Sequence, residues 1–375
     1  METRAAVLYD MGLPTPYAES KPLKIKQLEL DKPKKEEVLI DIKAAGLCHS
    51  DLSVINGSRP RPTPMALGHE AAGEVIELGE GVTDFEVGDH VVCTFIPSCG
   101  KCLPCKEGRP ALCENGAETN EAGEMLAGGK RLHEESSDIH HHLGVSGFAD
   151  YAVVSTHSIV KVDKSIPFEQ IALFGCAVIT GVGAIVNTAK VKSGSSVAVV
   201  GLGGIGLNAV MGAKIAGARE IIALDINPNK FDTAKSLGAT DVYDSSSNEV
   251  VDRIKKATNG GLDYVFETAG AISAMEVAFN ITKRGGTTTT TGLPHPEHEF
   301  SFPQVTLAAE ERTMKGSYVG SCVPTRDIPH FVDLFKQGKL PVHELLSDTI
   351  NLEEINEGFD RLEKGDVTRI IVTMK

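Results

Sequence analysis

The chain has 375 residues, and its 51 acidic side chains outnumber its 37 lysines and arginines, so its formal net charge is −14. A hydrophobic share of 41% is ample for a buried core and excludes a disordered chain, while the length suggests two domains. An acidic surface repels phosphate backbones, which argues against duplex nucleic acid as a partner. Eight cysteines are too few for a disulfide scaffold, so their placement is more informative than their number.

The first residues do not resemble a secretory signal, because Glu2, Arg4 and Asp10 interrupt any apolar run. Two later charge-poor stretches, 171–189 and 193–213, contain Gly, Ser, Thr or Asn and are not read as membrane spans. We therefore expect a cytoplasmic, reducing location. In such a compartment grouped cysteines more often bind metal or carry out chemistry than form disulfides.

The pattern of predicted elements changes along the chain. In the first 110 residues short strand-like segments alternate with Gly and Pro clusters; these segments are Ala5–Tyr9, Leu23–Leu30, Val38–Ala44, Gly73–Leu78 and His90–Phe95. From about Lys190 strands and helices alternate. The predicted strands are Ser196–Val200, Glu220–Leu224, Asp263–Glu267 and Gly286–Thr291, with helices ending near Ala216 and covering Lys230–Leu237. A β-rich region followed by a parallel sheet covered by helices is therefore predicted.

A glycine motif directly follows the first strand of the alternating region. The segment Gly201-Leu202-Gly203-Gly204-Ile205-Gly206 satisfies G-x-G-x-x-G and opens a helix, and Asp225 ends the next strand 19 residues later. Glycines allow close approach of a pyrophosphate to the helix N-terminus, and the acid accepts hydrogen bonds from ribose hydroxyls. Because Asp225 would repel a 2′-phosphate, NAD is favoured over NADP.

Four cysteines lie within fifteen residues, at positions Cys99, Cys102, Cys105 and Cys113. Four thiolates with this spacing surround one Zn²⁺ tetrahedrally and leave no open position, so such a zinc is structural. An iron–sulfur cluster and free thiols are the alternatives, although the spacing departs from the usual ferredoxin runs.

A second group of metal-ligating residue types is dispersed over Cys48-His49-Ser50-Asp51, Gly68-His69-Glu70 and Cys176. With the four-cysteine segment, the glycine loop and Asp225, these segments resemble the zinc-dependent alcohol dehydrogenases of the medium-chain dehydrogenase/reductase superfamily. The resemblance extends over nearly the whole chain. It implies that Cys48, His69 and Cys176 bind a catalytic zinc beside the structural one, which gives two zinc ions per chain.

The resemblance also assigns supporting roles in catalysis. Ser50 matches the hydroxyl that bonds the substrate oxygen, Asp51 the acid that orients the zinc histidine, and Glu70 a carboxylate near the metal. Ser53 stands where the family often has a relay histidine, which puts a histidine-mediated proton relay in doubt.

Further family positions concern the cofactor and the substrate. The cofactor-binding positions are His49, Thr180, Gly201, Gly203, Gly204, Ile205, Gly206, Asp225, Lys230 and Arg369. The positions expected to line the substrate channel are Phe95, His142, Leu143, Leu293 and Tyr318. The run His140-His141-His142 is metal-like in composition, but the family has a similar segment along the substrate cleft.

The implied fold joins a GroES-like, β-rich catalytic domain, residues 1–178 and 319–375, to a doubly wound Rossmann-type NAD-binding domain, residues 179–318. The implied activity is NAD-linked interconversion of primary, medium-chain or aromatic alcohols and aldehydes by hydride transfer from a zinc-bound alkoxide. A secondary-alcohol, polyol or thiol-adduct (S-hydroxymethyl) dehydrogenase, and a catalytically silent NAD-binding protein with structural zinc only, are the alternatives. The expected partner is a small alcohol or aldehyde, with no nucleic acid or membrane, in a homodimer or homotetramer.

Overall fold

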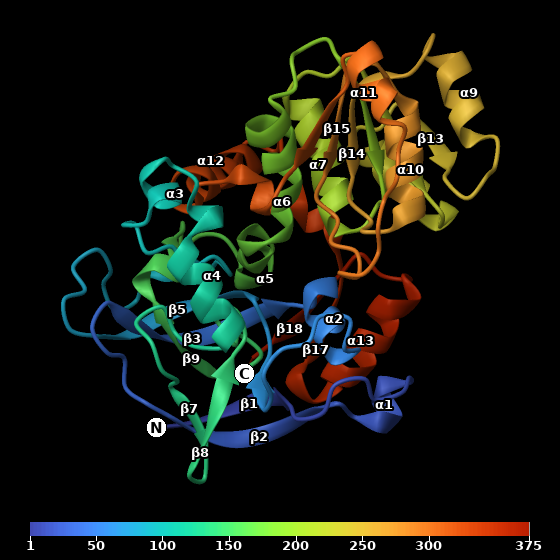
Figure 1. Cartoon of the computed structure of the whole chain (residues 1–375). Coiled ribbons are helices and arrows are strands. Elements are labelled where there is room, and N and C mark those ends of the chain that lie inside the picture. Colours follow the sequence, from blue (N-terminus) through green and yellow to red (C-terminus); the bar gives the residue numbers. More distant parts are fainter. Residues whose placement is uncertain (375) are drawn as a thin grey trace. The chain divides into compact units, whose positions relative to one another are not determined.

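The computed structural model describes residues 1–374 and divides them into two compact units (Figure 1). The first unit contains Met1–Cys176, Val323–Val332 and residues 342–374, and the second contains Ala177–Cys322 and Asp333–Pro341. The predicted domain boundaries, after residues 178 and 318, stay predictions. The division between compact units falls at 176/177 and 322/323 and adds a short segment near residue 337 to the second unit.

The first unit contains two β structures. Five strands close a barrel, in the order β1 (Glu2–Leu8), β2 (Leu23–Leu30), β7 (Leu132–Glu134), β8 (Ser137–His141) and β4 (Met65–Ala66). A seven-stranded sheet has the order β10 (Ile159–Lys161), β6 (His90–Cys93), β5 (Glu70–Leu78), β3 (Glu37–Gly46), β18 (Arg369–Thr373) and β17 (Leu346–Asn351), with β9 (Tyr151–Ser155) also paired to β3. Alternating buried side chains such as Val38, Ile40 and Ile42 place β3 in the hydrophobic core.

The central strand β3 brings distant segments to one end of this sheet. At its last residue, Gly46 pairs with Glu70 of β5 in antiparallel register, and it also pairs with Ile371 of β18. The residues that follow Gly46 and those that precede Glu70 therefore leave the sheet at the same end.

The second unit contains a six-stranded sheet in which every pairing is parallel. Its order is β13 (Asp241–Asp244), β12 (Glu220–Asp225), β11 (Ser196–Val200), β14 (Leu262–Glu267), β15 (Thr282–Thr290) and β16 (Thr313–Gly316). All five residues of β11 are buried, as expected for the centre of a parallel sheet. The strand order reverses direction at β11, which makes the sheet doubly wound.

Helices flank the parallel sheet of the second unit (Figure 1). They are α6 (Ala177–Gly183), α7 (Gly204–Ile215), α8 (Phe231–Leu237), α9 (Val250–Ala257), α10 (Ile272–Ile281) and α11 (Gln304–Ala309). The helices of the first unit are short apart from the last; they are α1 (Tyr17–Ser20), α2 (His49–Ile55), α3 (Leu103–Lys106), α4 (Glu114–Ala122), α5 (Phe168–Ile171) and α13 (Ile355–Lys364). Helix α12 (Pro324–Lys336) has residues in both units.

The predicted change from a β-rich region to alternating strands and helices is confirmed, and the differences are local. Leu23–Leu30 and Ser196–Val200 coincide with β2 and β11. Strand β15 begins at Thr282 rather than Gly286, because the glycines inside it suggest a turn although the strand continues through them. The helix predicted from Lys230 begins at Phe231, after a 3₁₀ turn over Pro228–Lys230.

No single helix among the described residues is long and apolar enough to cross a bilayer. The consecutive helical segments Phe168–Gly175 and Ala177–Ala189 satisfy the length and composition requirements only when taken together, and they are separated by a sharp bend.

A buried ion pair ties the barrel segment before β7 to the start of β3. Arg131 donates to both carboxylate oxygens of Glu37, at 2.9 and 2.6 Å, and both side chains are only 1% exposed. Removing one member of such a pair leaves the other charge uncompensated in a low-dielectric environment.

We expect Arg131→Met to lower the free energy of unfolding by about 3–5 kcal/mol, because the Glu37 carboxylate would stay buried without its counterion. Urea denaturation followed by circular dichroism measures the change. Arg361→Met, which breaks the exposed ion pair with Asp348, is the matched control and should leave stability nearly unchanged. Equal effects of the two substitutions would contradict the role assigned to the buried pair.

Candidate metal and nucleotide sites

Four potential ligands meet at the end of β3 described above. One ligand atom each from Cys48, His69, Glu70 and Cys176 lies within 4.8 Å of the other three, and all four residues are buried. The structure thus brings together the three residues that the sequence proposes as catalytic zinc ligands, although 128 positions separate the first from the last.

The sheet explains this convergence. Cys48 follows β3 by two residues and caps α2, while His69 immediately precedes β5, so the register of the two strands places them side by side. Cys176 follows a 3₁₀ helix that packs closely on β6. At Gly175 a Cβ atom would overlap the carbonyl oxygen of Cys93, and only glycine permits this approach.

A carboxylate lies behind His69. The Oδ2 atom of Asp51 is 3.0 Å from His69 Nδ1, and its Oδ1 atom is 3.1 Å from His142 Nδ1 and accepts the Gly68 amide at 3.2 Å. Neither imidazole is aligned well enough for a linear hydrogen bond, but both distances are of hydrogen-bond length. Burial alone would raise the pKa of Asp51, but the His69 and His142 imidazoles outweigh it and lower the pKa.

A second buried pair borders the cluster. Arg369, at the start of β18, donates to Glu70 Oε1 at 3.2 Å and to the Leu47 carbonyl at 3.1 Å. Burial raises the pKa of Glu70 to about 7, and the positive charge of Arg369 opposes this shift. Arg369, predicted as a cofactor contact, is thus 4% exposed and in contact with the donor cluster.

The donor set fits a zinc ion. Two sulfurs and one imidazole form the Cys₂His combination of catalytic zinc sites. The Nε2 atom of His69 is buried and has no hydrogen-bonding partner among residues 1–374, which is costly unless it binds a ligand. The adjacent Cys176 thiol is the main cause of a pKa of Cys48 well below its ordinary value, which favours the thiolate that a metal requires.

The four-cysteine segment forms a separate cluster. Ligand atoms of Cys99, Cys102, Cys105 and Cys113 all lie within 4.8 Å of one another around α3 and the start of α4. The Sγ atoms of Cys102 and Cys113 are 3.9 Å apart, close to the ~3.8 Å edge of a tetrahedron with Zn–S bonds of about 2.3 Å.

Backbone amides stabilise negative charge on this cluster. The amides of Lys101 and Cys102 each donate to Cys99 Sγ at 3.4 Å, and those of Cys99 and Gly116 donate to Cys113 Sγ at 3.2 and 3.3 Å. Although burial acts in the opposite direction, these amides lower the pKa of Cys99 to about 7. The geometry therefore suits four thiolates around one metal ion.

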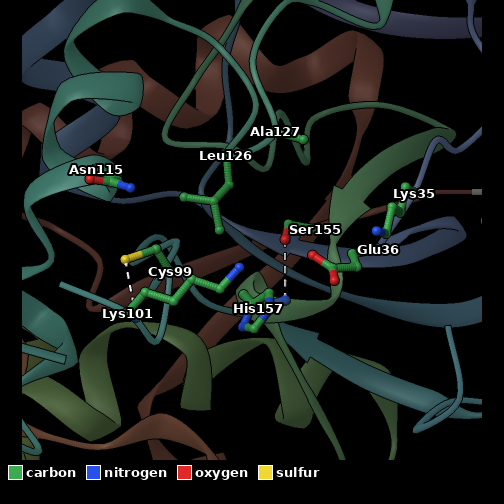
Figure 2. Close-up of a pocket in the computed structure, with 9 residues that line it drawn as sticks. All are labelled: Lys35, Glu36, Cys99, Lys101, Asn115, Leu126, Ala127, Ser155 and His157. Atoms are coloured by element: carbon green, nitrogen blue, oxygen red, sulfur yellow. Dashed lines mark hydrogen bonds between the residues drawn. The ribbon is translucent and has the colours of Figure 1, made fainter. Parts of the chain in front are cut away.

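A cavity of about 400 Å³ borders this lobe (Figure 2). Cys99 and Lys101 line one side of it, and Ser155 and His157, joined by a hydrogen bond from the His157 amide, line another. None of the predicted substrate residues lines this cavity, which therefore belongs to the surroundings of the four-cysteine cluster rather than to those of the Cys48 cluster.

The glycine loop of the second unit lies between β11 and α7, as predicted. A Cβ atom at Gly206 would overlap the carbonyl oxygen of Gly201, and Gly201 itself has a φ of +99°. A Cβ at Gly203 would meet nothing within 4 Å, so the space before the N-terminus of α7 is open to a ligand. Gly204 and Ile205 form the first turn of this helix, whose free amides suit a pyrophosphate.

Asp225 ends β12 beside this loop. Its carboxylate accepts the Leu202 amide at 2.6 Å and the Asn227 amide at 2.8 Å, and Lys230 Nζ is 3.5 Å away. The structure thus groups Asp225, Lys230 and the glycine loop. Thr180 is buried in α6 of the same unit, whereas His49 is exposed at the start of α2 in the first unit.

The predicted substrate residues are distributed over both units. Phe95 and His142 both contact the ring of His69 edge to face, with ring centroids 5.2 and 5.6 Å from it, and Leu143 follows His142 in the chain. Leu293 and Tyr318 belong to the second unit and are 51% and 42% exposed. Ser50 is half-buried in α2, and the Ser53 hydroxyl donates to the His49 carbonyl at 2.8 Å.

The histidine run does not form a metal site of its own. His140 Nδ1 is 3.0 Å from the Pro64 carbonyl, His141 accepts the Arg131 amide, and burial lowers the pKa of His141 to about 3. His142 instead joins Asp51 and His69, a contact that the sequence did not predict. The two unassigned cysteines, Cys93 and Cys322, are fully buried.

Two family descriptions match the chain. "Alcohol dehydrogenase GroES-like domain" matches residues 34–164, and "Zinc-binding dehydrogenase" matches residues 204–337. The first match contains most of the β-rich region with the two cysteine clusters, and the second begins within the glycine loop. The chain is a member of the zinc-dependent alcohol dehydrogenase family, in the medium-chain dehydrogenase/reductase superfamily, as the sequence resemblance predicted.

Individual relatives agree. The chain is 39% identical over 358 residues to alcohol dehydrogenase class-3 of Drosophila melanogaster, an alignment that covers 94% of each chain. It superposes with a TM-score of 0.93 on benzyl alcohol dehydrogenase from Acinetobacter calcoaceticus, at 33% identity and full coverage of both chains. It also superposes with a TM-score of 0.93 on an alcohol dehydrogenase zinc-binding domain protein from Burkholderia ambifaria, at 34% identity and 100% and 99% coverage. The predicted GroES-like and Rossmann-type fold class is thereby confirmed.

Proposed function

We propose that this oxidoreductase is an NAD-linked enzyme that interconverts primary, medium-chain or aromatic alcohols and aldehydes. The observation that carries the proposal is the buried convergence of Cys48, His69 and Cys176, with an imidazole nitrogen left unpartnered toward the thiols. Three protein ligands leave a zinc ion one position for a substrate oxygen, which a purely structural site does not provide. A silent NAD-binding protein would have no need of this second donor cluster.

The residues around the cluster have separate tasks in this proposal. A zinc ion held by Cys48, His69 and Cys176 supplies Lewis-acid polarisation of the substrate oxygen, and the nicotinamide supplies the hydride acceptor. Asp51 keeps His69 oriented through Nδ1. Ser50 Oγ takes the proton of the alcohol, and the burial of the surrounding side chains excludes water from the donor cluster.

The proposal has further parts that rest on the family resemblance. The four-cysteine cluster holds a second, structural zinc, and the enzyme works as a homodimer or homotetramer on a small alcohol or aldehyde without nucleic acid or membrane. Thiolate clusters of both kinds favour a reducing, cytoplasmic location.

Metal analysis tests the two-zinc proposal. We expect two zinc ions per wild-type chain by mass spectrometry, and one in each of Cys48→Ser and Cys105→Ser. The first variant should lose alcohol oxidation by at least about 10³-fold with little change in melting temperature, because only the Lewis acid is lost. The second should melt at a lower temperature, because a structural zinc contributes to folding. A single zinc in the wild type that persists in Cys48→Ser would refute the catalytic assignment.

Asp225 should decide the choice of cofactor. Asp225→Asn keeps the shape of the side chain but removes the charge that would repel a 2′-phosphate. We expect the ratio of kcat/KM for NADP to that for NAD to rise about tenfold or more, equivalent to ~1.4 kcal/mol. Asp244→Asn, at the end of neighbouring β13, is the control and should leave the ratio unchanged. An unchanged ratio in the Asp225 variant would remove this residue from cofactor discrimination.

A substrate series separates the candidate activities. We expect kcat/KM to be higher for hexanol and benzyl alcohol than for ethanol, a polyol, a secondary alcohol or a hydroxymethyl-thiol adduct. The aromatic edge of Phe95 against His69 and the similarity to a benzyl alcohol dehydrogenase support this order. Phe95→Ala should lower kcat/KM for benzyl alcohol more than for ethanol. The highest efficiency with the thiol adduct or a secondary alcohol would favour the alternative activities.

A further inference from the structure

We propose that His142 is a positioning residue for the catalytic metal site: through Asp51 it fixes the ring of His69 in the orientation that binds metal. The inference rests on the proposed function, because it takes His69 to be a metal ligand. Its geometrical basis is a carboxylate held between two imidazoles. One oxygen of Asp51 lies 3.0 Å from His69 Nδ1, and the other lies 3.1 Å from His142 Nδ1.

Burial makes this arrangement consequential. The side chains of His142, Asp51 and His69 are 2%, 0% and 1% exposed, so water cannot take the place of a missing contact. An unpaired buried carboxylate is costly, and it would turn toward whatever donor remained. With His142 in place, Asp51 has one imidazole at each oxygen and the Gly68 amide as a third contact.

Proton accounting gives the arrangement a direction. An ionised carboxylate only accepts hydrogen bonds, so the nitrogen that faces it on each ring is the one that carries hydrogen. For His69 this puts the proton on Nδ1 and leaves the Nε2 lone pair for a metal, on the side where Glu70 Oε1 lies 3.9 Å away. A carboxylate held in place on both sides therefore fixes the tautomer of the ligand as well as the angle of its ring.

The main chain holds His142 in place for this task. Its amide is shared between the Ser146 hydroxyl at 3.1 Å and the Ala66 carbonyl at 3.3 Å, and the next residue, Leu143, has a φ of +54°. The rings of His142 and His69 are perpendicular, with centroids 5.6 Å apart. His142 therefore contacts the ligand ring directly as well as through Asp51.

Two polar substitutions of similar character separate a positioning role from simple packing. In His142→Asn the side-chain amide nitrogen takes the position of Nδ1, whereas in His142→Gln it takes that of Nε2, away from Asp51. His142→Phe keeps a ring but removes the donor. The measurements are the rate at which a chromogenic chelator removes the zinc that depends on Cys48, and the visible absorption of the Co²⁺-substituted enzyme.

We expect the Gln and Phe variants to bind the catalytic metal about 10–100-fold more weakly, with a shifted Co²⁺ spectrum, and the Asn variant to stay within about threefold of wild type. The four-cysteine zinc and the melting temperature should be unchanged in all three. Equal metal retention by the Asn and Gln variants, or loss that follows a lowered melting temperature, would overturn the inference. Failure of the proposed function is recognised separately, because the wild type would then lack a zinc that depends on Cys48.

Discussion

The pairing of β3 with β5 and β18 is the constraint on which the candidate metal site depends. At Gly46 the two neighbouring strands approach so closely that a Cβ atom there would meet Glu70 Oε2 at 2.6 Å. The donors Cys48 and His69 are fixed by this register rather than by contacts with each other. A shift of one residue along β3 would turn alternate side chains to the opposite face and separate the donors.

Charge is the second organising feature of the first unit. Glu70, Arg369, Asp51 and the thiol pair lie in an environment from which water is excluded, and each has a partner of opposite charge or a donor nearby. Such groups are retained only if their mutual arrangement is kept, because any one left alone would carry a large desolvation penalty. The same requirement explains why the surroundings of the cluster are as specific as its ligands.

The sequence predicted what depends on local spacing. The glycine loop, Asp225 and the four-cysteine cluster could be located because their members are close in the chain or at fixed offsets, and the boundaries of β2 and β11 follow from uninterrupted apolar or alternating runs. The dispersed ligands were found by resemblance, since nothing local relates Cys48 to Cys176. The contact of His142 with Asp51 could not be predicted, because it depends on the tertiary placement of a loop that begins after β8. The glycines inside β15 misled for the opposite reason, since strand pairing overrode their turn preference.

The glycine loop and Asp225 divide recognition of a dinucleotide into a part that sequence change can tune and a part that it cannot. Gly201 and Gly206 have no room for a larger residue, so this stretch presents backbone atoms whatever the rest of the sequence becomes. Asp225 is a side chain, and Ile226 beside it is 73% exposed with freedom to vary. Divergence among chains of this fold is thus channelled to the adenosine end, where a single exchange redirects preference without rebuilding the phosphate cradle.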